Sequence, residues 1–272
     1  MSGRKMMSGR KMMSGRKMIS VPLKENERMD YLPVRRLKII QSEDVFVFSL
    51  DAILLAQFTY LPLQKGKIMD LCTGNGAIPL MLSMRTKARI DGVDIQHRLV
   101  DMAKRSVRFN QLADQIDIRQ LDVRDVPAVY GYGSYDVVTC NPPYLPGYAG
   151  QYNDNPHLAL ARHELKGTLE DFVRVAGDIV RPRGKIAFVH RPARMLELLT
   201  LMRRYRLEPK RLRFVYPKPG REANMMLVEG MKDGSADLRL LPPLFVYRED
   251  DCYTQEMEQI LGDESRWGMG RE

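Results

Sequence analysis

The chain has 272 residues, of which 44% are hydrophobic, and a formal net charge of +9 at pH 7. This apolar content is ample for a buried core, and no apolar run approaches the roughly 20 residues of a membrane-spanning helix. The three cysteines lack the paired spacing of a zinc site or a disulfide framework. We therefore predict a soluble cytoplasmic protein with free thiols and no metal site.

Much of the charge comes from residues 1–18, in which the hexamer Met-Ser-Gly-Arg-Lys-Met occurs three times. This repeat carries six of the nine net positive charges and leaves +3 for the remaining 254 residues. Because it has no apolar periodicity, we predict a disordered basic leader. A nucleic-acid-binding arm, a cloning remnant and an irregular start site remain open as its origin.

The chain from residue 19 onward predicts an entry segment and then a helix, which Ser49 or Asp51 can cap. One interpretation is a capped helix that covers the edge of a sheet. The other is a lid over a cofactor, in which Phe46 or Phe48 shields the ligand and Asp51 faces its charge.

A strand, a glycine turn and a helix are expected between residues 67 and 84, with Cys72, Gly74 and Gly76 in the turn. This order is typical of doubly wound nucleotide-binding sheets, whose ligand lies beyond the carboxyl ends of the strands. Glycines there allow positive φ and close backbone approach. Because Cys72 occupies the first glycine position of a dinucleotide fingerprint, we expect a nucleoside-like ligand without pyrophosphate.

Acidic residues end the next two expected strands. Asp94 follows Gly74 by 20 residues, which is the spacing of an acid that accepts hydrogen bonds from ribose hydroxyls. Asp122 comes later, where an acid can meet an adenine amino group. A helix cap is the alternative role for Asp94. The convergence of polar strand ends at one sheet edge favours the ligand-binding role.

The strand expected over 135–140 leads directly into Asn141-Pro142-Pro143-Tyr144. This turn suits methyl transfer to a planar, weakly nucleophilic nitrogen. The Asn141 side-chain oxygen and the Pro142 carbonyl can each accept one N–H of the amine, and Tyr144 can stack on a base. The rate of transfer would come from positioning of the amine and from fixed hydrogen-bond acceptors. No general base would have to remove a proton from the amine before transfer. An ordinary proline-rich turn is the alternative.

The segment 145–167 is polar and long, which predicts a substrate flap, with a plain surface loop as the alternative. Thr168, followed by Asp171, predicts a helix that ends at Arg181-Pro182-Arg183-Gly184. A strand at 185–190 and a helix at 192–205 should follow. The four histidines have no metal spacing and receive no role.

Two final strands, expected over 212–216 and 224–229, flank a turn sequence and predict an antiparallel hairpin. Basic residues gather around them, and Glu208 is the only acid between residues 203 and 221. We expect this basic cluster to contact nucleic-acid phosphates, with a solvated face as the alternative. Its members are Arg203, Arg204, Arg206, Lys210, Arg211, Arg213, Lys218 and Arg221.

The ordered motifs, from the glycine turn to Asn141-Pro142-Pro143-Tyr144, resemble those of class I S-adenosylmethionine-dependent methyltransferases. The resemblance implies an α/β fold, with a doubly wound, Rossmann-like, seven-stranded, mostly parallel sheet and a terminal antiparallel hairpin. It also implies S-adenosyl-L-methionine as cofactor. We expect one domain over 19–262, including the N-terminal lid segment, and a polar tail over 263–272.

Two further stretches, Phe48 to Ala52 and Arg221 to Gly230, resemble the bacterial branch that methylates N6 of the adenine beside the anticodon of a valine tRNA. The likeness covers about residues 30–250. It implies that Asn141, Pro142, Pro143 and Tyr144 hold the target amine. The implied cofactor-binding residues are Asp51, Asp70, Cys72, Gly74, Gly76, Asp94, Ile95, Asp122, Val123 and Asn141.

Within that implied set, Asp70 and Gly74 line the methionine portion of the cofactor, Asp94 takes the ribose, and Asp122 and Val123 bracket the adenine. The same four-residue turn also occurs in methyltransferases that act on glutamine in release factors, on guanine in rRNA or on adenine in DNA. The basic cluster and the flap favour a large anionic substrate such as tRNA, with the target base splayed out. The alternative from another functional class is a scaffold that binds RNA without catalysis. The intact turn Asn141-Pro142-Pro143-Tyr144 argues against this alternative.

Overall fold

The computed structural model describes residues 21–33, 37–45, 48–61, 64–144 and 167–262. The predicted leader, the polar tail, Phe46 and all of the flap except Gly167 lie outside these ranges. In the part of the chain that is described, no helix is long and apolar enough to cross a membrane.

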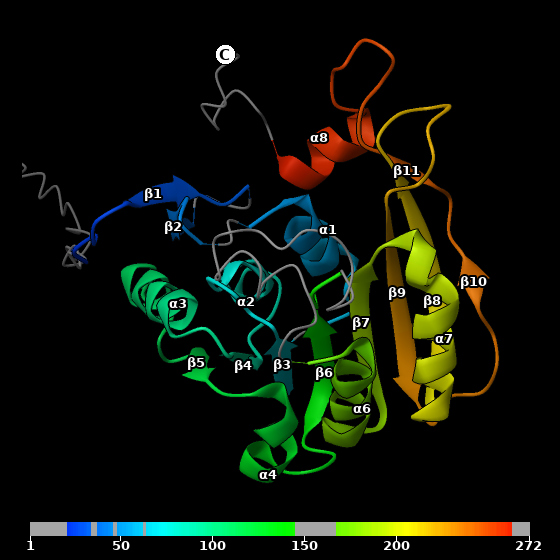
Figure 1. Ribbon diagram of the computed structural model, residues 1–272, viewed down its shortest axis with the longest axis horizontal. Coiled ribbons are helices and arrows are strands. Elements are labelled where there is room, and N and C mark those ends of the chain that lie inside the picture. The colour runs from blue at the N-terminus through cyan, green and yellow to red at the C-terminus, as the bar shows by residue number, and fades with distance from the viewer. Residues whose placement is uncertain (1–20, 34–36, 46–47, 62–63, 145–166, 263–272) are drawn as a thin grey trace, which may run out of the picture.

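A mostly parallel sheet forms the centre of the molecule (Figure 1). Its strands are β3 (Lys67–Leu71), β4 (Arg89–Asp94), β5 (Ile116–Gln120), β6 (Tyr135–Cys140), β7 (Val180–His190), β8 (Leu207–Tyr216), β9 (Met225–Lys232) and the two-residue β10 (Arg239–Leu240) and β11 (Leu244–Phe245). Their order is β10-β8-β9-β7-β6-β3-β4-β5, with β11 also paired to β8. β9 is antiparallel to both β7 and β8. The predicted fold class is therefore confirmed, and the short strands β10 and β11 extend the seven-stranded prediction to a sheet of nine strands.

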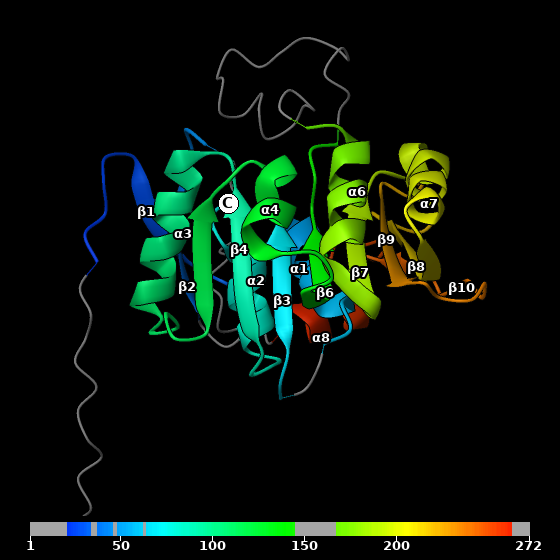
Figure 2. The same cartoon turned by 90° about the horizontal axis from the view of Figure 1, so that it is seen from below.

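Helices cover both faces of the sheet because successive strand residues point to opposite sides. Ile68 packs with α1, α2 and α8, whereas the next residue, Met69, packs with α6 and α7. Figure 2 shows α4 and α6 in front of the sheet and α1 and α8 behind it. The helices are α1 (Leu50–Phe58), α2 (Ala77–Ser83), α3 (His97–Phe109), α4 (Val126–Tyr130), α6 (Leu169–Ile179), α7 (Met195–Arg204) and α8 (Gln255–Leu261), with 3-10 helices η1 (Val123–Asp125) and η2 (Pro192–Arg194).

An N-terminal hairpin of β1 (Glu27–Tyr31) and β2 (Lys38–Ser42) lies beside α3. The side chains of Arg105 and Glu27 form an ion pair of 2.5 Å and are 10% and 1% exposed. The backbone N–H of Ile40 donates to the Ser106 hydroxyl at 2.9 Å. These contacts fix the segment that leads into α1. β1 was missed by the sequence prediction.

The transition from α6 to β7 differs from the predicted stop at Arg181-Pro182-Arg183-Gly184. The predicted capping box is present, with Thr168 and Asp171 each accepting from the other's backbone N–H. However, α6 already ends at Ile179. Tyr135 pairs with Val180 and Val137 with Lys185, so the four residues form a bulge inside β7. The turn-forming residues were recognised, but the strand continues on both sides of them.

The sequence prediction missed a short helix in each of two other segments: it did not predict helix α4 or helix α8. The Thr254 side chain caps α8 by accepting from the backbone N–H of Met257 at 3.3 Å. Both helices are short, at five and seven residues, so their apolar periodicity is weak.

Candidate active site

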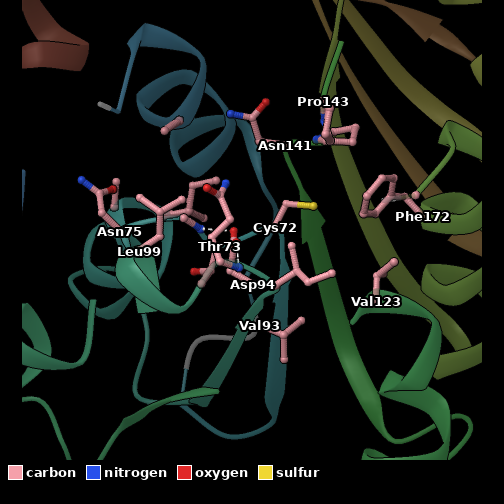
Figure 3. Close-up of a pocket in the computed structure, with 18 of the residues that line it drawn as sticks. Cys72, Thr73, Asn75, Val93, Asp94, Leu99, Val123, Asn141, Pro143 and Phe172 are labelled. Carbon is pink, nitrogen blue, oxygen red and sulfur yellow. Dashed lines mark hydrogen bonds between the residues drawn. The ribbon is translucent and has the colours of Figure 1, made fainter. Parts of the chain in front are cut away.

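A cavity of about 470 Å³ lies beyond the carboxyl ends of β3, β4, β5 and β6. Each strand contributes the residues that directly follow or end it, as Figure 3 shows for Cys72, Asp94, Val123 and Asn141. Parallel strands bring their carboxyl ends to one edge of a sheet, so residues far apart in sequence meet there.

Most of the predicted site residues line this cavity. They are Asp51, Cys72, Gly74, Asp94, Ile95, Asp122, Val123, Asn141, Pro142, Pro143 and Tyr144. Lining residues that the sequence reasoning missed include Thr73, Asn75, Gln96, Leu121, Phe172 and Arg191. Thr73, Asn75, Gln96 and Leu121 adjoin predicted positions. Phe172 lies in the helix predicted after Thr168, and Arg191 gave no local signal.

Asp70 does not line the cavity, and its contact with the methionine portion of the cofactor stays a prediction. Its side chain is fully buried in β3 and accepts a hydrogen bond of 2.6 Å from the hydroxyl of Thr139 in β6. Burial, which disfavours the charged form, raises the pKa of Asp70 to about 7. The carboxyl group therefore links two neighbouring strands inside the sheet.

The predicted role of Gly76 in cofactor binding also stays a prediction. Gly76 precedes α2 with a φ of 86° and is absent from the cavity wall, and a Cβ there would lie 3.1 Å from the Cβ of Ala103 in α3. The positive φ and this tight contact with α3 both disfavour a side chain at this position. Gly74, by contrast, lines the cavity with a φ of 56°, and an added Cβ would meet nothing within 4 Å. Gly74 leaves open space for a ligand.

Asp94 is held rigidly at the cavity wall. One carboxylate oxygen accepts from the backbone N–H of Gly74 and the other from that of Gln96, both at 2.9 Å. Burial raises the pKa of Asp94, and these hydrogen bonds oppose the shift. Each oxygen keeps a second lone pair that can accept from a ribose hydroxyl. Asp94 therefore accepts a hydrogen bond at the start of α3, as the helix-cap interpretation expects. It is also oriented to accept from a ribose hydroxyl, as the ligand-binding interpretation expects.

Tyr144 connects the turn after β6 to α1. Its hydroxyl donates to the Asp51 carboxylate and lies 2.6 Å from the side-chain oxygen of Asn141. Burial and the Asp51 carboxylate raise the pKa of Tyr144 well above its usual range, so the phenol stays protonated. Phe48 also lines the cavity, which agrees with the lid interpretation of this segment.

Two residues at the end of β7 surround the Tyr144 ring. The ring centroids of Tyr144 and His190 are 5.2 Å apart, and the Arg191 guanidinium lies 5.2 Å from the Tyr144 centroid. The Nδ1 atom of His190 accepts from the backbone N–H of Arg191 at 2.8 Å. Burial lowers the pKa of His190 to about 4, so its imidazole is neutral.

The predicted basic cluster is largely paired within the protein. Lys210 donates to the carbonyl oxygen of Ser235, and Arg221 has no side-chain partner among the described residues. The ion pairs are Arg203–Glu208, Arg204–Glu170, Arg206–Asp233, Arg211–Glu229, Arg213–Glu256 and Lys218–Asp251. Apart from Glu208, these acids lie outside residues 203–221. The local sequence therefore gave no sign that they neutralise the basic residues.

The sheet also divides the basic cluster. β8 runs parallel to β7, because both are antiparallel to β9. Arg203, Arg204 and Arg206 precede β8 and lie toward the edge opposite the cavity, whereas Lys218 and Arg221 follow β8 on the cavity edge. A ten-residue strand such as β8 spans roughly 33 Å. The eight residues therefore do not form one surface beside the cavity, and their contact with nucleic acid stays a prediction.

The lining chemistry fits S-adenosyl-L-methionine. Asp51, Asp94 and Asp122 bring three carboxylates to the wall, and Leu99, Val123 and Phe172 add apolar surface. The cofactor has a cationic sulfonium, an ammonium group, ribose hydroxyls and a planar adenine, which match carboxylates and apolar walls. The cavity volume lies in the range of roughly 300–1,000 Å³ that is usual for ligand sites.

Comparisons with known proteins agree with this geometry. Residues 40–206, more than half of the chain, match the family model described as methyltransferase small domain. A tRNA1(Val) (adenine(37)-N6)-methyltransferase of Aeromonas salmonicida is 29% identical over 180 residues, which cover 65% of this chain and 73% of that protein. A ribosomal protein uL3 glutamine methyltransferase of Bordetella pertussis is 32% identical over 114 residues, 39% of this chain and 37% of that protein.

The fold itself recurs in a crystal structure from Agrobacterium tumefaciens, described as a predicted O-methyltransferase. That structure has a TM-score of 0.64 at 23% identity and covers 78% of this chain and 95% of its own. The match of the family model, the sheet topology and the cavity at the carboxyl edge lead to one conclusion. The chain belongs to the methyltransferase small domain family and is an S-adenosylmethionine-dependent methyltransferase.

Proposed function

We propose that the protein methylates N6 of an adenine in tRNA, specifically the adenine beside the anticodon of a valine tRNA. The observation that carries this proposal is the position of Asn141-Pro142-Pro143-Tyr144 in the wall of the cofactor cavity. The name of the Aeromonas relative supports the choice of substrate. A cytoplasmic location follows from a tRNA substrate.

The turn after β6 provides acceptors for the target amine. The side-chain oxygen of Asn141 and the carbonyl of Pro142 would each accept one N–H, which draws the nitrogen out of the plane of the base and frees its lone pair. Pro142 is buried and its φ is fixed, so these acceptors are positioned before the substrate arrives. When bound, S-adenosyl-L-methionine supplies an electrophilic methyl group on its sulfonium.

Tyr144 would stack on the adenine, and the hydrogen bond to Asp51 would orient its ring. The surplus proton of the methylated amine leaves after transfer, so no residue must remove it beforehand. The remaining cofactor contacts are part of the same proposal. In it, Asp94 accepts from the ribose hydroxyls, Gly74 lies along the methionine portion, and Asp122 and Val123 flank the adenine ring of the cofactor.

A glutamine side chain is a second candidate acceptor. Its amide nitrogen is also planar, so Asn141 and Pro142 could hold it in the same way. The Bordetella relative, named as a ribosomal protein uL3 glutamine methyltransferase, favours this alternative.

The test is to incubate the protein with labelled S-adenosyl-L-methionine and, separately, tRNA, rRNA, DNA, a release factor and ribosomal protein uL3. Mass spectrometry then identifies the modified group. N6-methyladenosine formed in tRNA alone is the expected result. Label on a protein glutamine, or on guanine, would keep the enzyme class and overturn the substrate.

A further inference from the structure

The cavity wall has an uneven distribution of charge. Asp51, Asp94 and Asp122 are its carboxylates, and Arg191 is the only Lys or Arg among the described residues that line it. The carboxylates suit the cationic cofactor. Asp122 is already paired with Arg124 at 2.6 Å. Asp51 and Asp94 would repel the phosphates of a nucleic-acid substrate, so a nucleotide that enters here needs a cation close to the acceptor turn.

Arg191 is held in position next to that turn. It directly follows β7, the neighbour of β6, which leads into Asn141. One guanidinium nitrogen donates to the carbonyl oxygen of Asn224 at 2.8 Å, and the backbone N–H donates to His190. The guanidinium lies over the Tyr144 ring, 5.2 Å from its centroid. Arg191 is thus fixed beside the predicted base-stacking residue.

Arg191 also keeps its charge available. Its side chain is exposed and forms no ion pair with any carboxylate in the described ranges. Most of the predicted basic cluster, by contrast, is paired with acids. A guanidinium has five N–H donors, and the carbonyl of Asn224 uses one of them. The remaining donors can form a two-pronged contact with a phosphate.

We infer that Arg191 binds a backbone phosphate next to the target nucleotide and thereby selects a nucleotide over a glutamine side chain. This inference rests on the proposed function, because it requires a nucleic-acid substrate. A base stacked on Tyr144 carries its sugar and flanking phosphates toward the neighbouring guanidinium. A glutamine side chain brings no anion and leaves Arg191 without a counter-charge.

The first experiment compares Arg191→Ala, Arg191→Lys and the wild type on an RNA stem-loop that contains the adenosine identified in the substrate screen. Arg191→Ala should raise KM roughly tenfold or more at low salt. It should also flatten the plot of log affinity against log salt by about 0.7, the value for one lost contact to single-stranded RNA. Arg191→Lys should keep most of the slope, and cofactor affinity, measured by calorimetry, should not change.

Arg181→Ala is the matched control. Arg181 is the second residue of the same strand, at the end opposite Arg191; its side chain is 52% exposed and pairs with Asp136 at 2.6 Å. Its replacement removes one positive charge at the opposite sheet edge, so the salt slope for the stem-loop should stay as in the wild type. An equal loss of slope in both variants would indicate a general charge effect and would overturn the inference.

The second experiment replaces one phosphate beside the target adenosine by a neutral methylphosphonate. The wild type should lose affinity for this RNA, and Arg191→Ala should lose no more than it has already lost. Additive losses would show that Arg191 does not contact that phosphate. The two proposals fail differently. No methylation of tRNA by the wild type overturns the proposed function, whereas tRNA methylation with an unchanged slope in Arg191→Ala overturns only the role of Arg191.

Discussion

The hydroxyl of Tyr144 lies 2.6 Å from the side-chain oxygen of Asn141, the atom that we propose as an acceptor for the target amine. The same hydroxyl also donates to Asp51. A phenol has one proton, so it can serve only one of these acceptors at a time. When the phenol donates to Asp51, both lone pairs of the Asn141 oxygen remain available to accept from a substrate amine.

Replacement of Tyr144 should separate the role of its ring from that of its hydroxyl. Tyr144→Phe keeps the stacking surface and frees the Asn141 oxygen, so kcat/KM should change by less than about tenfold. Tyr144→Ala also removes stacking, which contributes about 1–3 kcal/mol per base, and should lower kcat/KM by roughly 5- to 150-fold. Steady-state kinetics on the tRNA substrate make the comparison. Equal losses in the two variants would assign the effect to the hydroxyl.

Asn141→Ala should remove methyl transfer and leave RNA binding intact. Loss of one fixed acceptor that stabilises the developing positive charge should lower kcat by about 10²- to 10³-fold. Single-turnover rates report the chemical step, and fluorescence anisotropy reports RNA affinity. A variant that retains the wild-type rate would contradict the role of the turn.

Asp70 should make folding stability depend on pH. The pKa of Asp70 is about 7 in the fold and about 3.9 in an unfolded chain, so between these values only the folded state keeps the proton. The free energy of unfolding should therefore fall as pH rises from about 4 to about 7, by an amount on the order of 4 kcal/mol. Asp70→Asn is neutral throughout and should lack this fall, which makes it more stable than the wild type at pH 8.

Urea unfolding at pH 5, 6, 7 and 8 measures this difference between the variant and the wild type. A difference that stays constant with pH would rule out titration of Asp70. Because Asp70 does not line the cavity, Asp70→Asn should also bind the cofactor with wild-type affinity. A large loss of cofactor affinity in Asp70→Asn would support the prediction that Asp70 contacts the methionine portion of the cofactor.

Arg211 should stabilise the fold and not bind RNA. Its guanidinium donates to Glu229 and to the carbonyl oxygen of Phe58, both at 2.8 Å, and the Glu229 side chain is 3% exposed. Arg211→Ala leaves that buried carboxylate with Lys185 at 3.4 Å and should cost about 3 kcal/mol. Arg181→Ala, which removes an exposed pair, should cost less than about 1 kcal/mol. A stable Arg211→Ala variant with a flattened salt slope would instead support phosphate binding.

The ordered motifs were predictable because they depend on short-range backbone requirements. Apolar runs mark β3 and β6, and Gly74 permits a positive φ that most residues avoid. Once the chain alternates strands and helices, a parallel sheet follows, and its carboxyl edge must collect the residues after each strand. The sequence alone therefore predicts that Asp94 and Asn141 lie at one cavity, as they do in the fold.

The sequence by itself determined the fold class, the position of the site and the acceptor turn. The tertiary structure decided which charges are free, because an ion pair depends on distance in space and not on distance along the chain. Arg213 is paired with Glu256, 43 residues away. Arg191, which the pairing of β6 and β7 brings beside Tyr144, has no carboxylate partner among the residues that the structure describes. Likewise, only the packed sheet shows that Asp70 is enclosed between strands while Asp94 faces the cavity.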